Sequence, residues 1–252
     1  IIGEFELEKE LIDNALEIIQ REKISDEANW IDGYIENAAQ GLYKELEYVK
    51  LNIDKSKTVL EYGSAPFVFT KALYLAGYKV VGTDIAPERF KNFCKLNLDV
   101  RKVNYDNESL PVESESIDEI ICNEVFEHMR GNLIKTFEEA HRVLKKGGKI
   151  HVTTPNVRSI KGIYMFLFKS KSCSCACDLY HEWNKIETIG HMGHVREYTA
   201  QEVKEFMLQI GFNFNSVDFT GSSKGGYKTK IFNLFEIFFP SLRPIMRLVF
   251  EK

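Results

Sequence analysis

The sequence lacks a long uncharged apolar run, and it lacks an excess of positive charge. No apolar stretch reaches the roughly 18 uncharged residues that a membrane-spanning helix requires. The nearest approach, 231–250, carries Glu236, Arg243 and Arg247, so we expect no spanning helix there. Lys and Arg number 33 against 37 Asp and Glu, for a net charge of −4. Neither a basic run nor a basic half of the chain favours a nucleic-acid partner.

Cysteine is also scarce, with five in 252 residues. Two stand alone in apolar segments and three form the cluster Cys173, Cys175 and Cys177. An odd count in this arrangement does not fit a secreted disulfide framework, so we expect a reducing, cytoplasmic setting. The cluster lies near His181 but lacks the Cys-x₂-Cys pairs of common structural zinc sites. We therefore interpret it as a segment of small residues.

The first half of the chain changes from helical periodicity to an alternating pattern. Residues 4–22 and about 26–50 carry apolar stripes at helical spacing. Short β-branched runs then alternate with helical stretches, which predicts strands at 58–62, 79–84, 100–104, 117–123 and 149–154, and helices at 69–76, 87–96 and 133–144. Strands that alternate with crossover helices indicate an α/β fold with a parallel sheet covered on both faces.

The regular alternation stops after Pro155. Residues 156–190 look irregular and aromatic, and an insert of this kind beside a sheet edge is typical of a substrate-binding cap. A helix returns at 199–210, with a capping box formed by Thr199 and Glu202. Residues 212–220 read as a last strand. The Phe-rich stretch 226–250 indicates either a helix pair packed on the domain or an interfacial surface that makes peripheral membrane contact or a dimer.

Acidic residues stand at the ends of the expected strands. Glu61 begins the loop 61–67, Asp84 ends the second strand, and Asp106 with Asn107 follows the third. Ligands of open α/β sheets bind beyond the carboxyl ends of the strands, where a carboxylate such as Asp84 can accept the hydrogen bonds of a ribose diol. An Asp at the third station can take an adenine amino group. The pattern fits an adenosine ligand, a dinucleotide also fits it, and each Asp could instead cap a helix.

Four segments of the sequence carry a family resemblance. They read "VLEYGSAPFVFTKALYLAGYKVVGTDIAPERF", "DNESLPVESESIDEIICNEVFEHM", "HRVLKKGGKIHVTTPN" and "GHVREYTAQEVKEFMLQIGF". From about residue 57 to 220 the chain resembles class I S-adenosylmethionine-dependent methyltransferases. A nicotinamide dehydrogenase is the competing interpretation of the fold, but such enzymes do not usually carry this series of segments.

The resemblance implies a Rossmann-like, doubly wound, seven-stranded and mostly parallel sheet whose last hairpin is reversed. It implies an N-terminal helical segment, 1–56, packed on or over the cofactor site. The methyltransferase domain would span 57–252, with a helical cap insert at about 156–195. It places the methionine part of S-adenosylmethionine over Gly63, and the implied cofactor contacts are Glu61, Gly63, Ser64, Ala65, Asp84, Ile85, Asp106, Asn107 and Asn123.

The loop "EYGSAPF" departs from the family pattern acidic-x-Gly-x-Gly-x-Gly. Gly63 is kept, but Ala65 and Phe67 stand where the pattern has glycine. Pro66 fixes its own φ and restricts Ala65 to extended conformations. The ring of Phe67 either packs into the sheet or leans over the cofactor pocket, and the second outcome would leave a degenerate pocket that binds no cofactor.

Residues after the fourth strand are candidates for the chemistry. Methyl transfer requires alignment and dry walls, and an oxygen or nitrogen nucleophile usually requires a base or a metal. The segment Glu124-x-x-Glu127-His128 is similar to ubiquinone-pathway O-methyltransferases and small-RNA terminal 2′-O-methyltransferases, and the later His194 matches a histidine of the RNA branch. That resemblance implies Mg²⁺ held by Glu124, Glu127, His128 and His194. Alternatively His128 or His194 acts as a metal-free base, or these side chains only join the cap to the sheet.

The expected function is therefore O-methylation of a small molecule, a glycan or a lipid precursor by S-adenosylmethionine. The alternative from another class is a methyltransferase-fold protein that binds or scaffolds without catalysis. A metal-dependent RNA 2′-O-methyltransferase is a further alternative, which the absence of basic excess disfavours.

Overall fold

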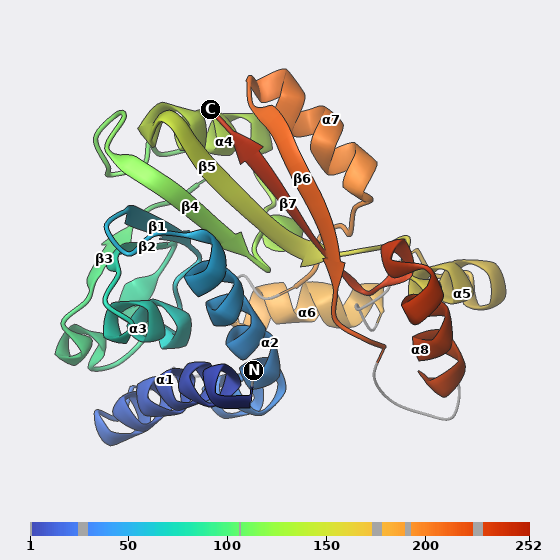
Figure 1. Ribbon diagram of the computed structural model, residues 1–252, viewed down its shortest axis with the longest axis horizontal. Coiled ribbons are helices and arrows are strands. Elements are labelled where there is room, and N and C mark those ends of the chain that lie inside the picture. The colour runs from blue at the N-terminus through green and yellow to red at the C-terminus, as the bar shows by residue number, and fades with distance from the viewer. Residues whose placement is uncertain (1, 25–29, 106, 173–177, 190–192, 224–228) are drawn as a thin grey trace. The chain divides into compact units, whose positions relative to one another are not determined.

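The computed structural model of the chain describes residues 2–24, 30–105, 107–172, 178–189, 193–223 and 229–252 (Figure 1). Asp106 and the cysteine cluster at 173–177 lie outside these residues. In the described chain the strands form one seven-stranded sheet of order β3-β2-β1-β4-β5-β7-β6. The chain divides into two compact units, a first unit of residues 1–121 and 142–148 and a second unit of residues 122–141 and 149–252.

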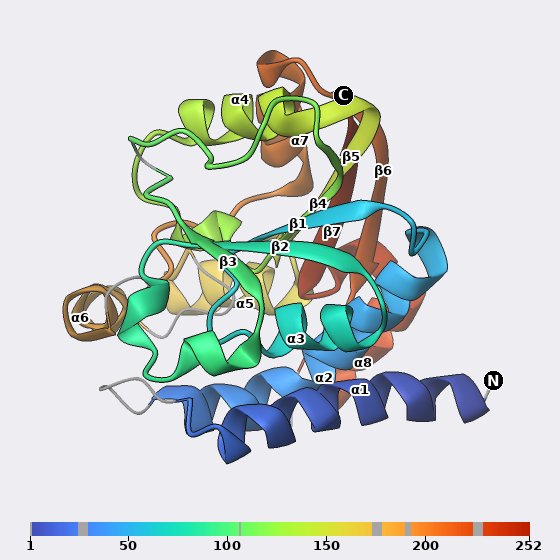
Figure 2. The ribbon, with the colours of Figure 1, turned by 90° about the vertical axis from the view of Figure 1, so that its left-hand side faces the viewer.

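The first unit contains the start of the α/β alternation. Its strands β1 (Thr58–Tyr62), β2 (Lys79–Asp84) and β3 (Asp99–Lys102) are parallel, with Glu61 opposite Gly82 and Gly82 opposite Val100. Helices α1 (Ile2–Arg21) and α2 (Trp30–Asn52) pack against each other and against α3 (Val68–Leu75), as Figure 2 shows. β1 and β2 are buried nearly throughout, which explains their continuous apolar sequences.

One expected helix of the first unit is wrong. Residues 87–96 form two short 3₁₀ turns, η1 (Pro87–Arg89) and η2 (Phe93–Leu96). Between them Phe90 is extended and Asn92 has a φ of +64°, and neither conformation continues an α-helix. β3 ends at Lys102, two residues before the expected end.

The second unit contains the end of β4 (Ile117–Asn123), η3 (Phe126–His128) and most of α4 (Leu133–Val143) and β5 (Leu144–Pro155). It continues with α5 (Ile160–Lys169), α6 (Leu179–Ile189), α7 (Ala200–Ile210), β6 (Asn213–Thr220), α8 (Thr229–Phe238), η4 (Pro240–Leu242) and β7 (Ile245–Glu251). β7 is antiparallel to both β5 and β6. The reversed last hairpin is therefore confirmed.

Three expectations for the second unit need correction. Residues 245–251 form β7 and not part of a helix pair, because Met246, Leu248 and Phe250 are buried in a strand paired on both sides. The region 156–190, which the local sequence pattern predicted to be irregular, contains α5 and α6, and helices there agree with the helical insert that the resemblance implies. β5 begins five residues before the expected 149, so the glycine pair at 147–148 lies inside the strand.

Helix α7 confirms the capping box. The Thr199 hydroxyl accepts the Glu202 N–H, and the Glu202 carboxylate accepts the Thr199 N–H over 2.8 Å. Gly211, with a φ of +113°, ends the helix in the left-handed conformation that glycine favours. Across the described residues, each helix is too short or too polar to cross a bilayer.

Candidate functional site

The loop after β1 makes a tight turn in the first unit. Gly63 has a φ of +67°, and the N–H of Ser64 donates to the Thr83 carbonyl over 3.0 Å. The N–H of Phe67 donates back to the Ser64 carbonyl over 2.6 Å and closes the turn into α3. A Cβ at Gly82 would lie 2.4 Å from the Ser64 Oγ, so a larger residue on β2 would have to displace the Ser64 hydroxyl.

Asp84 is buried, and both of its carboxylate oxygens accept backbone hydrogen bonds. Oδ2 accepts the N–H of Ala65 over 3.1 Å, and Oδ1 accepts the N–H of Ala86 over 3.0 Å. Burial raises the pKa of Asp84, and the two backbone hydrogen bonds oppose that rise. The carboxylate therefore holds the loop, and each oxygen keeps a second lone pair that could accept a ribose hydroxyl.

Glu61 is directed toward α3. Its Oε2 accepts the Thr70 hydroxyl over 2.5 Å, so Thr70 and not a loop amide is its partner. Burial raises the pKa of Glu61 to about 8, because the ionised form loses more hydration than the Thr70 hydrogen bond restores. The Asp84 charge adds to the rise. In the folded chain Glu61 is therefore largely uncharged near neutral pH.

Phe67 takes the left-handed conformation of a glycine, with a φ of +71°. Its ring is fully buried in the core of the first unit. The ring meets Phe90 edge-on at 5.2 Å between centroids and stacks on Phe93 at 5.8 Å. The ring therefore packs beneath the loop and does not lean over a pocket.

Tyr105 is a loop partner that the sequence reasoning missed. Its hydroxyl oxygen accepts the N–H of Gly63 over 3.1 Å and lies 3.0 Å from both the carbonyl and the Oγ1 of Thr83. Its ring lies 5.1 Å from that of Tyr62. The available signal was an aromatic residue directly before Asp106, in the segment that follows the third strand.

The remaining predicted cofactor contacts are Ile85, Asn107, Asn123 and Asp106. Ile85 is half-buried after β2, and the N–H of Asn107 donates to the Asn104 carbonyl over 3.2 Å. Asn123 is half-buried at the end of β4, in the second unit. Asp106 lies outside the described residues, so its role stays a prediction.

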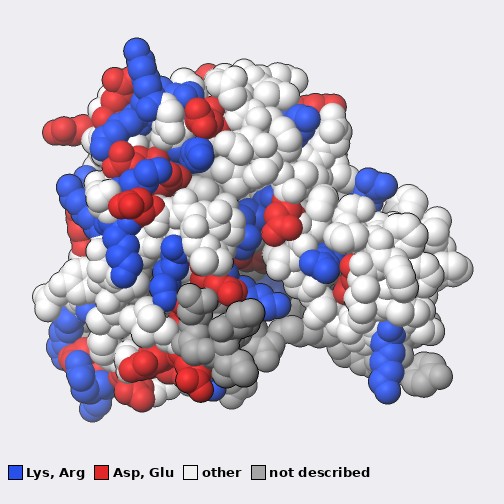
Figure 3. Space-filling view, viewed as in Figure 1, with Lys and Arg blue, Asp and Glu red and all other residues white. Residues whose placement is uncertain are grey.

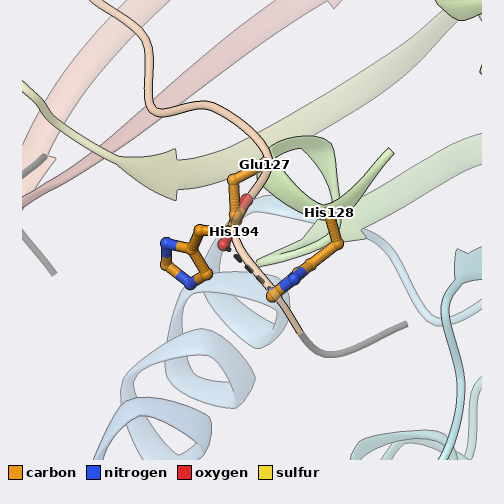
Figure 4. A group of neighbouring side chains, drawn as sticks. All are labelled: Glu127, His128 and His194. Carbon is orange, nitrogen blue, oxygen red and sulfur yellow. Dashed lines mark ion pairs between the residues drawn. The ribbon is translucent and has the colours of Figure 1, made fainter. Parts of the chain in front are cut away.

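The second unit brings together Glu127, His128 and His194 (Figure 4). One ligand atom from each residue lies within 4.8 Å of the others. Glu127 is 1% exposed, and its Oε2 accepts the Thr154 hydroxyl over 2.8 Å. Its Oε1 has no hydrogen-bond partner among the described residues and lies 3.8 Å from the His128 Nε2. A buried carboxylate oxygen without a hydrogen bond is costly unless a ligand completes it.

Both imidazole rings are oriented through Nδ1. The His128 Nδ1 lies 3.1 Å from the Gly193 carbonyl, and the His194 Nδ1 lies 3.4 Å from Glu197 Oε1. The rings are nearly perpendicular, with centroids 4.8 Å apart. Acceptors at Nδ1 favour the tautomer in which Nε2 carries a lone pair, which is the usual arrangement around metal-binding histidines.

Backbone contacts hold the His194 segment to η3. The N–H of Val195 donates to the Glu127 carbonyl over 2.9 Å, and the N–H of His194 donates to Glu182 Oε2 over 2.9 Å. Phe126 anchors the same region through ring contacts with Phe137 and Tyr198. Glu127 thus positions His194 with its main chain and faces it with its side chain.

The pKa values of the two histidines shift in opposite directions. Burial lowers the pKa of His128, and the neighbouring His194 lowers it further, against the opposing Glu127 charge. Burial also opposes charge on His194, but the hydrogen bond to Glu197 and the nearby carboxylates outweigh it and raise that pKa. Neutral His128 can therefore accept a proton or bind a cation.

One carboxylate and two imidazoles make a donor set for a divalent cation of borderline softness. The buried Glu127 Oε1, which accepts no hydrogen bond from the described residues, could serve as a ligand of such an ion. Glu124 does not belong to this group among the described residues: it is exposed, with a φ of +54°. The structure therefore assembles three of the four predicted ligands.

Comparisons with known proteins indicate which family the chain belongs to. A family model described as a methyltransferase domain matches residues 34–217. A search of curated proteins found no match. A Thermotoga maritima S-adenosylmethionine-dependent methyltransferase, described as a possible histamine N-methyltransferase, is 19% identical with a TM-score of 0.59 and covers 89% of this chain and 97% of its own.

Two further solved structures are similar. An Archaeoglobus fulgidus S-adenosylmethionine-dependent methyltransferase is 15% identical, with a TM-score of 0.55, over 84% of this chain and 94% of its own. A Haloferax volcanii protein solved with the Trm112 methyltransferase activator is 17% identical, with a TM-score of 0.59, over 90% of this chain and 97% of its own. These identities show a shared fold, and the family match extends over most of the sequence. The chain therefore belongs to the methyltransferase-domain family, among the class I S-adenosylmethionine-dependent methyltransferases.

Proposed function

We propose that this protein transfers a methyl group from S-adenosylmethionine to an oxygen of a small molecule, a glycan or a lipid precursor. We further propose that Glu127, His128 and His194 bind a divalent cation that assists the transfer. The observation that carries the second proposal is the buried Glu127 Oε1, for which the described part of the chain offers no hydrogen-bond partner and which faces two histidines oriented through Nδ1.

The proposed roles follow from the contacts. Gly63 and Asp84 would position the cofactor, with Asp106 near the adenine. Glu127 and the two Nε2 atoms would hold the cation, while Thr154 fixes the carboxylate and Gly193 fixes the His128 ring. A cation bound there would lower the pKa of an acceptor hydroxyl and so supply the nucleophile at neutral pH.

The donor set refines the expected metal. Mg²⁺ prefers oxygen ligands in octahedral geometry and usually keeps several waters. Two imidazoles with one carboxylate suit Zn²⁺, Mn²⁺ or Fe²⁺ better. We therefore favour one of these ions over the Mg²⁺ that the sequence resemblance implies.

A metal-free base is the second candidate mechanism. The lowered pKa of buried His128 keeps its imidazole neutral and able to accept a proton from an acceptor hydroxyl. This alternative uses the same side chains, so a metal measurement separates the two. The nitrogen acceptor named for the Thermotoga maritima protein belongs to that protein, and we keep a nitrogen acceptor as the runner-up for this chain.

The test of the cation site combines metal content with metal titration. Purified protein would be analysed for bound metals, stripped with chelator and titrated with Zn²⁺, Mn²⁺ and Mg²⁺ by calorimetry, and Glu127→Gln would be compared with Glu124→Gln. We expect Zn²⁺ or Mn²⁺ to bind the wild type and Glu124→Gln but not Glu127→Gln. Equal metal binding by all three proteins would exclude the site.

The non-catalytic alternative needs its own measurement. S-adenosylmethionine and S-adenosylhomocysteine would be titrated into the protein by calorimetry, with NAD as the control for the dehydrogenase interpretation. We expect both sulfur ligands to bind and NAD not to bind. Absence of binding at millimolar ligand would remove the enzyme proposal and leave a scaffold.

A further inference from the structure

Helix α8 has its polarity reversed relative to an ordinary surface helix. The side chain it buries most deeply is Glu236, which is 3% exposed and accepts both the N–H and the hydroxyl of Ser223, over 3.1 and 2.5 Å. Its solvent side carries Ile231, Leu234, Phe235 and Phe238, spaced i, i+3, i+4 and i+7. A helix of a globular domain normally turns such a stripe inward.

Helix α5 extends this apolar surface. Phe166, Leu167 and Phe168 are 65–71% exposed. The two helices pack on each other, with the rings of Tyr164 and Phe232 5.6 Å apart. We call the combined surface the α5–α8 face, made of Phe166, Leu167, Phe168, Leu234, Phe235 and Phe238. Single exposed apolar residues are ordinary, but several large ones on two helices that pack on each other indicate an interaction site.

The exposed charges beside this face are positive. Arg158, Lys169 and Lys230 are exposed and Lys171 is half-buried. The only acidic residue within 157–172 and 229–244 is Glu236, which is buried against Ser223. In Figure 3 the surface over α5 and α8 is mostly uncharged, with little red. The whole chain carries a net charge of −4, so the basic border is a local feature.

We propose that the α5–α8 face docks onto an anionic lipid surface. Aromatic and aliphatic side chains would enter the headgroup–acyl boundary while the basic side chains meet lipid phosphates. Apolar insertion and basic attraction together give stable but reversible attachment, which neither gives alone. This inference does not depend on the proposed methyl transfer.

The test is co-sedimentation with vesicles of phosphatidylcholine alone and of phosphatidylcholine mixed with phosphatidylglycerol. We expect binding to the anionic vesicles, weakened by salt. The double variant Phe235→Ser/Phe238→Ser should lose about tenfold in partitioning for each aromatic side chain removed. Lys169→Glu/Lys171→Glu should weaken binding to anionic vesicles about fivefold or more per residue.

A matched control removes exposed apolar residues elsewhere. Leu51 and Ile134 are 73% and 55% exposed, and Leu51→Ser/Ile134→Ser should bind vesicles like the wild type. If the α8 variant fails to fold, Phe166→Ser/Phe168→Ser on α5 tests the same face. The proposal is overturned if anionic vesicles do not bind, or if the control weakens binding as much as the α5 or α8 variants. It is also overturned if sedimentation shows a dimer that these variants abolish while vesicles remain unbound.

Discussion

The loop after β1 and the group around Glu127 use their polar atoms in opposite ways. In the loop, the Asp84 oxygens accept backbone N–H groups, Gly63 donates to Tyr105, and Glu61 accepts from Thr70. Around Glu127, the Nδ1 atoms of the histidines have acceptors, while the buried Oε1 accepts no hydrogen bond from residues that the structure describes. The loop groups named above thus have hydrogen-bond partners within the chain, whereas the Glu127 Oε1 has none among the described residues.

The two regions therefore differ in whether a ligand must displace existing hydrogen bonds. A ligand that takes the Gly63 N–H must displace the Tyr105 hydroxyl, so binding there would involve exchange of hydrogen bonds, whereas the second lone pairs of Asp84 could accept a ligand without exchange. A cation at Glu127 would complete an existing carboxylate and displace no hydrogen bond of Oε1. Substitutions in the two regions test this contrast.

Glu127→Gln should lower kcat by about 10²- to 10⁴-fold, because it removes the charge that would hold a cation or support a base. Steady-state kinetics with an identified acceptor measures this. Glu124→Gln, at an exposed carboxylate outside the group, is the matched control and should change kcat little. Equal losses in the two variants would contradict the assignment of Glu127.

Phe67→Ala should destabilise the fold by about 3–5 kcal/mol, because it removes a fully buried ring from between Phe90 and Phe93. Urea unfolding of the variant measures the loss. Phe67→Gly removes the same ring but suits the φ of +71°, so it should be more stable than Phe67→Ala by about 1 kcal/mol. A loss no greater than that of an exposed residue would place the ring outside the core.

The raised pKa of Glu61 predicts that the free energy of unfolding depends on pH. Its folded pKa of about 8 lies above the ordinary glutamate pKa of 4.5, so its stabilisation is complete below pH 4.5 and is lost as the pH rises through 8. We expect the wild type to lose about 3 kcal/mol between about pH 5 and pH 8 from this group. Urea unfolding across that range should show a smaller slope for Glu61→Gln. A slope of the same sign should remain, because the pKa of Asp84 is also raised.

Tyr105→Phe should cost about 1 kcal/mol of stability, because it removes the acceptor of the Gly63 N–H. If the cofactor competes for that N–H, S-adenosylhomocysteine should bind the variant more tightly than the wild type in calorimetry. Tyr43→Phe, which loses a hydrogen bond to Asp13 in the same unit, is the control for stability alone. Weaker binding by Tyr105→Phe would mean that the hydroxyl contacts the ligand directly.

The sequence predicted the parts of the fold that local patterns determine. The buried β-branched runs of β1, β2 and β4 and the capping box of α7 were found because each carries its signal within a few residues. β7 was missed because "IMRLVFE" is a short apolar run that fits a helix or a strand, and its pairing with β5 and β6 decides between them. The helix expected at 87–96 failed because Asn92 adopts a left-handed conformation.

The candidate site was likewise predictable only where its residues are neighbours in the sequence. Adjacent Glu127 and His128 are visible in the sequence, but the approach of His194 depends on the bond from the Val195 N–H to the Glu127 carbonyl. The exposure of Glu124 follows from its backbone turn after β4, which no spacing reveals. The contact of Tyr105 with Gly63 joins residues 42 positions apart.

The left-handed Phe67 has a consequence for how this loop can change. A glycine at that position would relieve the backbone, yet it would also empty the space between Phe90 and Phe93. Restoring the glycine pattern by one substitution is therefore expected to be harmful, and it becomes acceptable only after neighbouring residues fill the space. The residues packed around the ring, more than the loop itself, now determine which residue can occupy position 67.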